Sequence, residues 1–228
     1  MEWIAHRGAN TEFAENTLAA FTRAFERGAD AIELDVHATR DGEVVVHHDP
    51  VARAPRGGDA TSPRALTIEE STLADLRMLW KAPPELQIPT LSAVLAIVPR
   101  DKRAYVEIKG LRIESAVADV LARSSVLTVV HSFEQRAIGR MRALAPDVPR
   151  GVLLSRRVPD IGGLMREAAA RDVWPDAVIA DGALVDAVHH AGGRVIVWTV
   201  NHPAEARRLI KLGVDGICTD DVRLRDSV

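Results

Sequence analysis

Two carboxylates placed two residues apart are the first sign of chemistry in this chain. In the segment A-I-E-L-D-V, Glu33 and Asp35 alternate with apolar residues. Successive side chains of a strand point to opposite faces, so one face of this segment is apolar and suits packing on helices. The other face carries both carboxylates, and a cation between them would relieve their repulsion. The segment therefore predicts a buried strand with an acidic, cation-binding face.

A tight turn follows this strand. Asp41-Gly42 is the commonest two-residue hairpin signal, because both positions accept a positive φ. This loop would place Asp35 opposite His48, and directly opposed residues share a face. We therefore expect His48 on the acidic face and His47 on the other face. A register shifted by one residue would exchange the two histidines.

A second pair of ionisable residues, Glu107 and Lys109, ends another predicted strand and projects to one face. Together with Glu33 and Asp35, Glu107 would supply three hard oxygen donors. Such donors suit Mg²⁺, Ca²⁺ or Mn²⁺ better than zinc, which prefers histidine and cysteine in closed sites. The alternative interpretation is a structural ion network in which these acids pair with neighbouring basic residues.

Imidazole and cationic side chains complete the candidate site. His6 and His48 are the candidate proton donor and acceptor, because imidazole titrates near neutral pH. Arg7 and Lys109 could neutralise a bound phosphate, and Trp198 could line a substrate surface. The other histidines of interest are expected to be structural, peripheral or on the surface: His37, His131, His189, His190 and His202.

Repeated strand and helix patterns must position these residues. Strands are expected at Trp3–His6, Ala31–Val36, Ala104–Ile108, Val126–His131, Arg150–Leu154, Ala177–Ala180, Arg194–Thr199 and Gly216–Thr219. Helices are expected at Thr17–Arg27, Leu91–Val98, Glu114–Arg123, Glu134–Leu144, Ile161–Arg171, Leu184–Ala191 and Ala204–Leu212. Eight strands that alternate with helices, in a chain slightly below ~250 residues, favour a closed (β/α)₈ TIM barrel, with active-site residues at the carboxyl ends of the strands. An open doubly wound sheet is the alternative, but no G-x-G-x-x-G follows the first strand.

One segment, at about residues 50–88, interrupts this rhythm. It is rich in Pro, Gly and Arg, and its capping residues and apolar spacing predict one helix over Thr67–Leu79, with Trp80 extending the same apolar face. We expect it to be a short insertion after the second strand. The whole chain, residues 1–228, is then a single barrel domain.

Composition narrows the class of protein. The chain has 228 residues and a net charge of -3, so nothing indicates nucleic acid or an anionic membrane as the main partner. The lone Cys218 has an apolar setting typical of a buried thiol. No leader peptide is apparent, and the longest apolar run, Leu91 to Val98, is too short to span a bilayer. We expect a cytoplasmic protein without stable membrane insertion, while its oligomeric state stays open.

These residues also carry a resemblance to a known family. The ordered motifs are His6-Arg7-Gly8, Glu15-Asn16-Thr17, Glu33-Leu-Asp35-Val36, Thr39-Arg-Asp41-Gly42, His48-Asp49, Pro89-Thr90-Leu91, Glu107-Ile-Lys109, Trp198-Thr-Val-Asn201 and Thr219-Asp220. In this order, from residue 6 to residue 220, the chain resembles the glycerophosphodiester phosphodiesterase family.

The resemblance implies a (β/α)₈ barrel that hydrolyses a small glycerophosphodiester to an alcohol and glycerol 3-phosphate with one divalent cation. By motif, the resemblance implies that Glu33, Asp35 and Glu107 are metal ligands. It also implies that His6 and His48 are the general acid and base, and that Arg7 and Lys109 contact phosphate. In the family's mechanism the glycerol 2-hydroxyl attacks phosphorus, and water then opens the cyclic phosphate.

One departure from the family pattern bears on the substrate. The family usually follows His-Asp with an Arg-x-Thr-x-Gly-x-Gly-like run, whereas residues 51–58 keep Arg53 but lose the threonine. This loop borders the mouth of the barrel, so the departure concerns the choice of substrate. Soluble glycerophosphodiesters are the first hypothesis for the substrate. Lysophospholipids, cleaved in the manner of a phospholipase D, are the second, and a non-enzymatic phosphate-binding barrel is the third.

Overall fold

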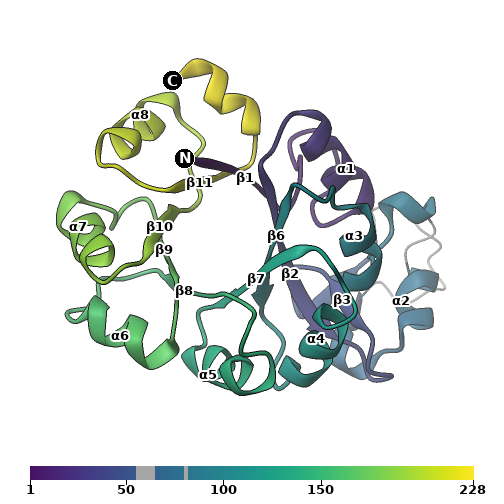
Figure 1. Ribbon diagram of the computed structural model, residues 1–228. Coiled ribbons are helices and arrows are strands. Elements are labelled where there is room, and N and C mark those ends of the chain that lie inside the picture. The colour runs from purple at the N-terminus through teal and green to yellow at the C-terminus, as the bar shows by residue number, and fades with distance from the viewer. Residues whose placement is uncertain (55–64, 80–81) are drawn as a thin grey trace.

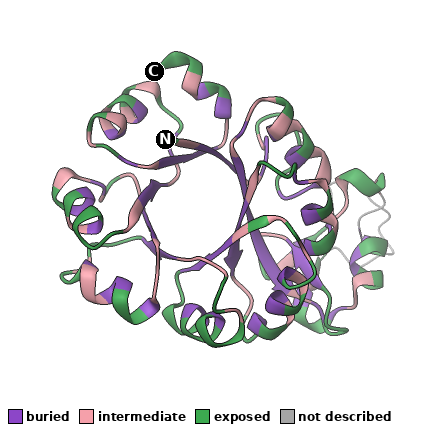
Figure 2. Ribbon diagram, viewed as in Figure 1, coloured by how far each residue is buried: buried purple, intermediate pink, exposed green. Residues whose placement is uncertain are grey.

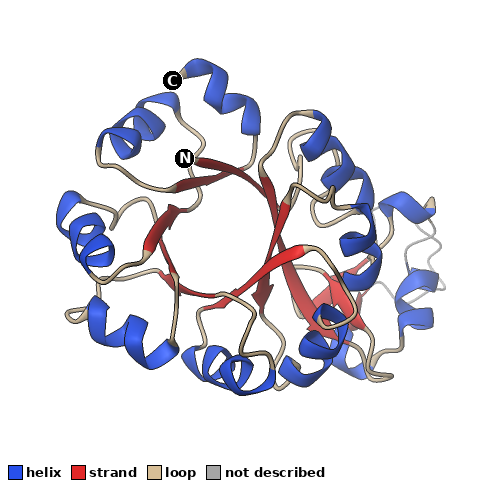
Figure 3. Ribbon diagram, in the orientation of Figure 1, coloured by secondary structure: helices blue, strands red, loops and turns tan. Residues whose placement is uncertain are grey.

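Eight parallel strands close into a barrel that is surrounded by helices (Figures 1 and 3). The computed structural model describes residues 1–54, 65–79 and 82–228. Closure is shown by the first strand, which pairs in parallel with both the second and the last. The barrel strands are β1 (Glu2–His6), β2 (Ala31–Ala38), β6 (Arg103–Ile108), β7 (Leu127–Ser132), β8 (Arg150–Leu154), β9 (Asp172–Pro175), β10 (Arg194–Val197) and β11 (Gly216–Thr219). The predicted fold class is confirmed.

The helices lie outside the barrel, with their buried faces towards the strands (Figure 2). They are α1 (Leu18–Glu26), α3 (Leu91–Ile97), α4 (Glu114–Leu121), α5 (Gln135–Leu144), α6 (Ile161–Ala168), α7 (Gly182–His190) and α8 (Pro203–Lys211). A short 3₁₀ helix, η3 (Val222–Ser227), follows β11 where an eighth helix would stand. None of the helices within the described residues has the length and apolar character needed to cross a membrane.

The segment between β2 and α3 contains several short elements. β3 (Val44–Val46) pairs antiparallel with β2, and β4 (Val51–Arg53) pairs antiparallel with β5 (Ala65–Thr67). Two 3₁₀ helices and one α-helix follow: η1 (Ile68–Glu70), α2 (Leu73–Leu79) and η2 (Pro84–Leu86). Residues 55–58 of the atypical loop and Trp80, on which the sequence analysis commented, lie outside the described residues.

Strand β2 shows how alternation separates the two sides of the barrel wall. Ile32, Leu34 and Val36 belong to the apolar core between the barrel and the helices. Glu33 and Asp35 have the opposite parity and are buried inside the barrel wall. The predicted division of this strand into an apolar and an acidic face is therefore confirmed.

The middle of the barrel is filled by side chains. Each of the eight strands contributes one buried residue to this cluster: Ile4, Ala31, Tyr105, Val129, Leu153, Trp174, Ile196 and Cys218. The interior is thus a packed core and not a pore. Polar side chains on the inner face can reach open space only at the two ends of the barrel.

An ionic cluster closes the amino-terminal end. The Glu2 carboxylate, 12 % exposed, accepts hydrogen bonds from Arg103 Nη1, Arg194 Nη2 and the Tyr105 hydroxyl, each at 2.7 Å. Burial opposes ionisation of Glu2, but the bonds from Arg194 and Tyr105 outweigh it and lower the pKa of Glu2. The charged carboxylate is therefore part of the folded structure at this end.

The predicted register of the β2–β3 hairpin is wrong by one residue. Val36 pairs with Val46, so Asp35 lies opposite His47 and not opposite His48. The turn needs a third loop residue because only Gly42 has a positive φ (85°), whereas the two-residue type I′ turn needs two such positions. The Thr39 hydroxyl fixes the longer loop by accepting a hydrogen bond from the Glu43 amide at 3.0 Å.

Two predicted elements also need correction. The sixth strand is β9, not Ala177–Ala180, because α6 ends early at Ala169, whose left-handed φ of 45° stops the helix. The expected helix over Thr67–Leu79 is divided into η1 and α2. Thr72 and Asp75 form reciprocal side-chain-to-backbone hydrogen bonds that start α2 at this point. The other predicted strands and helices are present and differ only at their ends.

The cluster around Glu2 yields a test of stability and its pH dependence. Glu2→Gln should lower the free energy of unfolding at pH 7 by about 1–3 kcal/mol, because two partly buried guanidinium groups lose their anionic partner. A carboxylate with a lowered pKa stabilises the fold above its unfolded value of 4.5, and this contribution is lost as pH falls through the folded pKa. In urea unfolding experiments, the difference in the free energy of unfolding between Glu2→Gln and the wild type should therefore become smaller below pH 4.5.

Glu26→Gln is the matched control, since this side chain is 56 % exposed and forms a surface pair with Arg23. It should change stability by less than about 0.5 kcal/mol. A Glu2→Gln protein as stable as the wild type at pH 7 would contradict the assigned role.

Candidate active site

A cavity of about 190 Å³ opens at the carboxyl-terminal end of the barrel. Seven of the eight residues singled out from the sequence line it: His6, Arg7, Glu33, His48, Glu107, Lys109 and Trp198. The eighth, Asp35, is fully buried and contacts two of the residues that line the cavity, Arg7 and Lys109. The structure thus brings all eight together.

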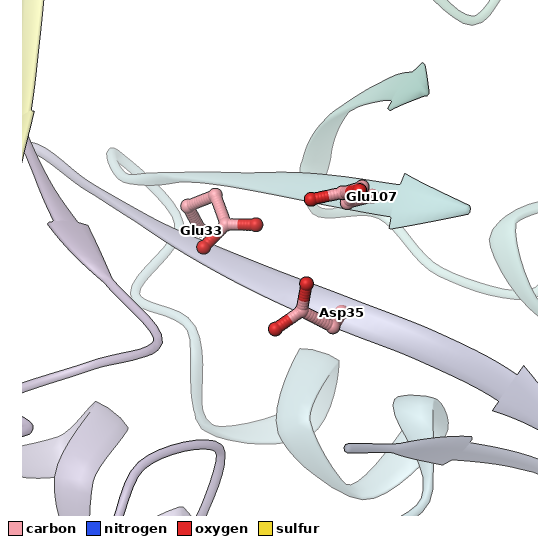
Figure 4. A group of neighbouring side chains, drawn as sticks. All are labelled: Glu33, Asp35 and Glu107. Atoms are coloured by element: carbon pink, nitrogen blue, oxygen red, sulfur yellow. The ribbon is translucent and has the colours of Figure 1, made fainter. Parts of the chain in front are cut away.

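The three carboxylates lie within reach of a single ion. Glu33, Asp35 and Glu107 each offer an oxygen, and these oxygens lie within 4.8 Å of one another. Asp35 and Glu107 are register partners on the adjacent parallel strands β2 and β6. Figure 4 shows Glu33 and Asp35 on one strand, with Glu107 on its neighbour. This oxygen set suits a hard divalent cation.

Two cationic side chains are placed against these acids. Arg7 Nε lies 3.1 Å from Asp35 Oδ2. Lys109 Nζ lies 3.1 Å from Glu107 Oε1 and 3.4 Å from Asp35 Oδ1. The ion network considered from the sequence is therefore present, and it occupies the same space as the proposed cation site.

The acids cannot all ionise easily in this space. Burial, together with the neighbouring Asp35 and Glu33 charges, raises the pKa of Glu107 to about 7. Burial also acts against ionisation of Asp35, but Arg7 and Lys109 hold the pKa of that carboxyl below its ordinary value. A raised pKa beside a lowered one means that the local positive charge does not fully compensate three carboxylates. The residues present therefore fit a divalent cation.

His6 is oriented by a carboxylate from the last barrel strand. Its Nδ1 lies 2.7 Å from Asp220 Oδ1, and Asp220 also accepts hydrogen bonds from Asn10 and Asn201. Burial lowers the pKa of His6, but the hydrogen bond to Asp220 and the Glu33 charge outweigh it, so the net shift is upward. For Asp220, the hydrogen bond from His6 overcomes burial and lowers the pKa to about 2.

His48 reaches the cavity by a different route from the one predicted. Strand β3 ends at Val46, so residue parity no longer decides where His48 points. His37 Nε2 lies 3.1 Å from the His48 carbonyl oxygen, and His48 Nδ1 lies 2.7 Å from Asp49 Oδ1. His37 therefore supports the loop that presents His48, a contact that the expected peripheral position did not include.

The first βα loop shapes one side of the site. Arg7 and Gly8 both have a positive φ (57° and 85°), and the Arg7 amide donates to a Glu33 carboxylate oxygen at 3.2 Å. A Cβ at Gly8 would lie 2.7 Å from the Ala20 carbonyl carbon, so a larger residue does not fit against α1. This turn brings Arg7 and His6 against the acidic strand.

Asn16 is a supporting residue whose contact the sequence interpretation missed. Its side-chain amide donates to Asp35 Oδ2 at 2.9 Å, and its own φ is 58°. The next residue, Thr17, caps α1 by accepting a hydrogen bond from the Ala20 amide. A hydrogen bond from a neutral donor fixes the orientation of the carboxylate without adding charge.

His131 was expected to be structural or on the surface; it is buried and not on the surface, and it lines the cavity. It is 1 % exposed and is the register partner of Glu107 on β7. Its position two residues after the inward-facing Val129 was the available signal.

Two aromatic side chains form the rim. Trp198 Nε1 donates to the Trp174 carbonyl at 2.9 Å. The Trp198 ring meets Phe133 edge-on, with centroids 5.4 Å apart. Phe133 is 44 % exposed and so leaves an apolar surface open at the mouth.

This cavity combines three carboxylates that could hold a cation with two aspartate-paired histidines and two basic side chains. Such an arrangement is typical of enzymes that act on phosphate esters. The comparisons with known proteins define the class more narrowly. A model of the glycerophosphoryl diester phosphodiesterase family matches residues 6–224. The chain belongs to this family and is a phosphoric diester hydrolase. The resemblance noted from the sequence is confirmed, and the non-enzymatic alternative is not retained.

Individual relatives and solved structures agree. YhdW of Bacillus subtilis (strain 168) is 34 % identical over 235 residues, covering 95 % of this chain and 93 % of its own. A glycerophosphodiester phosphodiesterase of Caldanaerobacter subterraneus is 32 % identical over 228 residues, covering 96 % and 93 %. The fold is similar to that of an Oleispira antarctica phosphodiesterase solved with its product sn-glycerol-3-phosphate, with a TM-score of 0.87. The two sequences are 23 % identical, and the match covers 100 % of this chain and 96 % of the other.

The contact from Asn16 can be tested by removing its amide. Asn16→Gly keeps a residue that tolerates the positive φ but leaves Asp35 without this donor. We expect the affinity for Mn²⁺ to fall about 10- to 100-fold in isothermal titration calorimetry, as is typical when the partner of a metal ligand is lost. Asn10→Gly is the control, because that amide contacts Asp220 and not a carboxylate of the cation site. An equal loss in both variants would contradict the assignment.

Proposed function

We propose that this enzyme hydrolyses small glycerophosphodiesters to an alcohol and glycerol 3-phosphate, using one divalent cation and a pair of histidines. The observation that carries the proposal is the convergence of three carboxylates within 4.8 Å, in a cavity that two histidines also line. Family membership supports the substrate class. Metal dependence and histidine catalysis rest on the geometry alone.

Glu33, Asp35 and Glu107 are the proposed ligands of the cation. Mg²⁺ or Ca²⁺ fits this oxygen set, and Mn²⁺ is a third candidate. The bound ion would polarise a phosphoryl oxygen and offset negative charge that develops in the transition state. Arg7 and Lys109 would add positive charge beside the phosphate from the same cavity.

His6 and His48 are the proposed proton carriers. Each has its Nδ1 within 2.7 Å of an aspartate oxygen, which leaves Nε2 to exchange a proton with the substrate. The pKa of His6 is raised, so His6 suits the donor that protonates the departing alcohol oxygen. His48 is then the acceptor for the proton of the attacking hydroxyl, which we assign to the glycerol moiety.

The departing alcohol has an adjoining space. Lys109 lines both the catalytic cavity and a larger hollow of about 490 Å³. Arg40, Arg112 and Glu69 also line this hollow, so its charged side chains include two cations and one acid besides Lys109. These charged side chains can contact a small, water-soluble alcohol group, although Leu111 and Ile113 line the same hollow.

The proposal is tested by removing one ligand and one proton carrier. Glu33→Ala and His48→Ala should each lower kcat on glycerophosphocholine about 100-fold or more, because one change weakens cation binding and the other removes proton transfer. Activity should also be lost with a chelator and restored by Mg²⁺, Ca²⁺ or Mn²⁺. His190→Ala is the control, since this exposed histidine contacts the Asp186 carbonyl of its own helix. Near wild-type turnover in either site variant would refute the assigned role.

Lysophospholipids are a second candidate substrate, favoured by apolar side chains at the barrel mouth. Four loops that follow barrel strands each expose one large apolar residue: Phe13 at 40 %, Leu111 at 77 %, Phe133 at 44 % and Val178 at 91 %. An exposed apolar side chain on these loops could contact an acyl chain. The feature lies at the same end of the barrel as the catalytic cavity.

Paired substrates decide between the two candidates. If lysophospholipids are the substrates, a Leu111→Ser and Val178→Ser double variant should lower kcat/KM for lysophosphatidylcholine about tenfold and leave that for glycerophosphocholine unchanged. If soluble diesters are the substrates, the wild type should turn over glycerophosphocholine and show little activity on the lysolipid.

A further inference from the structure

His131 is a buried side chain with no assigned task. It is 1 % exposed, and within the described part of the chain neither ring nitrogen has a hydrogen-bond partner. The nearest ionic group, Glu33 Oε1, lies 3.8 Å from Nε2, beyond hydrogen-bond distance. Because the residue also lines the catalytic cavity, its unpaired donor and acceptor adjoin the space where a substrate binds.

Packing, and not hydrogen bonding, fixes this imidazole. The ring meets Trp174 edge-on, with centroids 4.4 Å apart. Gly151 is the register partner of His131 on β8, and a Cβ added to Gly151 would lie 3.2 Å from both His131 Cβ and Trp174 Nε1. Three neighbouring strands therefore hold the ring in place while its nitrogens stay unpaired. Burying unpaired polar nitrogens costs folding free energy, which an aromatic ring of similar shape would avoid.

Charge divides the cavity into two walls. The acidic and cationic side chains come from β1, β2, β6 and the residues that follow them. Among the described residues, the other wall contains no carboxylate, lysine or arginine. It is formed by three side chains towards the mouth and three from the packed middle: His131, Phe133 and Trp198, and Leu153, Trp174 and Cys218. A phosphate belongs on the charged wall, and an uncharged polyol fits the other, where apolar surface meets CH groups and an imidazole can pair with a hydroxyl.

We propose that His131 is a substrate-binding residue whose ring hydrogen bonds a hydroxyl of the glycerol moiety. This inference rests on the proposed function and adds a specificity contact to it. An imidazole offers one donor and one acceptor, which match the two capacities of a hydroxyl. A site built in this way discriminates against an analogue that lacks the hydroxyl.

Two ligands that differ only in their hydroxyls test the proposal. Glycerol 3-phosphate and propyl phosphate are titrated into the Mg²⁺-supplemented protein by isothermal calorimetry. His131→Phe should weaken glycerol 3-phosphate binding about tenfold, the loss expected for one hydrogen bond, and change propyl phosphate binding less than about twofold. His131→Gln, which keeps a donor and an acceptor, should restore most of the affinity for glycerol 3-phosphate.

Stability gives a second readout that a purely structural role would move in the opposite direction. His131→Phe should unfold at a temperature equal to or above that of the wild type, because two unpaired buried nitrogens are removed. Leu153→Ala is the matched control on the same wall. This change removes apolar contact and should weaken the binding of glycerol 3-phosphate and of propyl phosphate to the same extent.

Each outcome is decisive. Equal weakening of both ligands by His131→Phe, or a lowered unfolding temperature with no ligand preference, would overturn the glycerol contact while leaving the proposed function intact. A wild type that neither turns over glycerophosphodiesters nor binds glycerol 3-phosphate would overturn both.

Discussion

Repulsion among three carboxylates in one buried space is the constraint on which the site depends. Glu33, Asp35 and Glu107 are each less than one tenth exposed, so water cannot screen their charges. Arg7 and Lys109 relieve part of the repulsion, yet the pKa of Glu107 stays raised to about 7. A site with this residual imbalance suits the proposed divalent cation, because the ion would complete its charge, and a phosphate could then share the same positive field.

The three carboxylates and the ionic cluster around Glu2 lie at opposite ends of the barrel strands. The inward residues of β6 are Arg103 at the closed end, Tyr105 in the packed middle and Glu107 at the mouth. β1 repeats the order with Glu2, Ile4 and His6. A strand residue advances by about 3.3 Å, so two steps carry the side chain from one layer to the next. The packed middle keeps water and opposite charges of the closed end away from the reacting end.

The two histidines reach equivalent hydrogen bonds by unrelated routes. Asp49 follows His48 directly in the chain, so the hydrogen bond between these two residues is local. Asp220 lies 214 residues from His6, and its contact exists only because the last strand closes on the first. The barrel therefore has to be closed before His6 has its partner, so the proposed role of His6 in proton transfer depends on closure of the barrel.

Much of the site follows from backbone geometry that operates within a few residues. The parity of Glu33 with Asp35, and of Glu107 with Lys109, needs only the two-residue repeat of a strand, and the ordered strand–helix units were sufficient to predict the barrel. The hairpin register was not predictable in this way. The loop has three residues instead of two, and the Thr39 hydroxyl stabilises it by accepting a hydrogen bond from the Glu43 amide. The extra residue places His47, and not His48, opposite Asp35. His48 nevertheless lines the cavity, since the strand ends before it.

The amino-acid sequence by itself determined which side chains of β2 and of β6 share a face and which end of each strand carries them. Only the tertiary structure decided that Asp220 contacts His6 and that Asn16 contacts Asp35. It also decided that His131 is buried beside Glu107 with no hydrogen-bond partner among the described residues. The physical reason is range: alternation along a strand is set by adjacent peptide units, whereas these contacts depend on which strands become neighbours and how far each loop carries the chain.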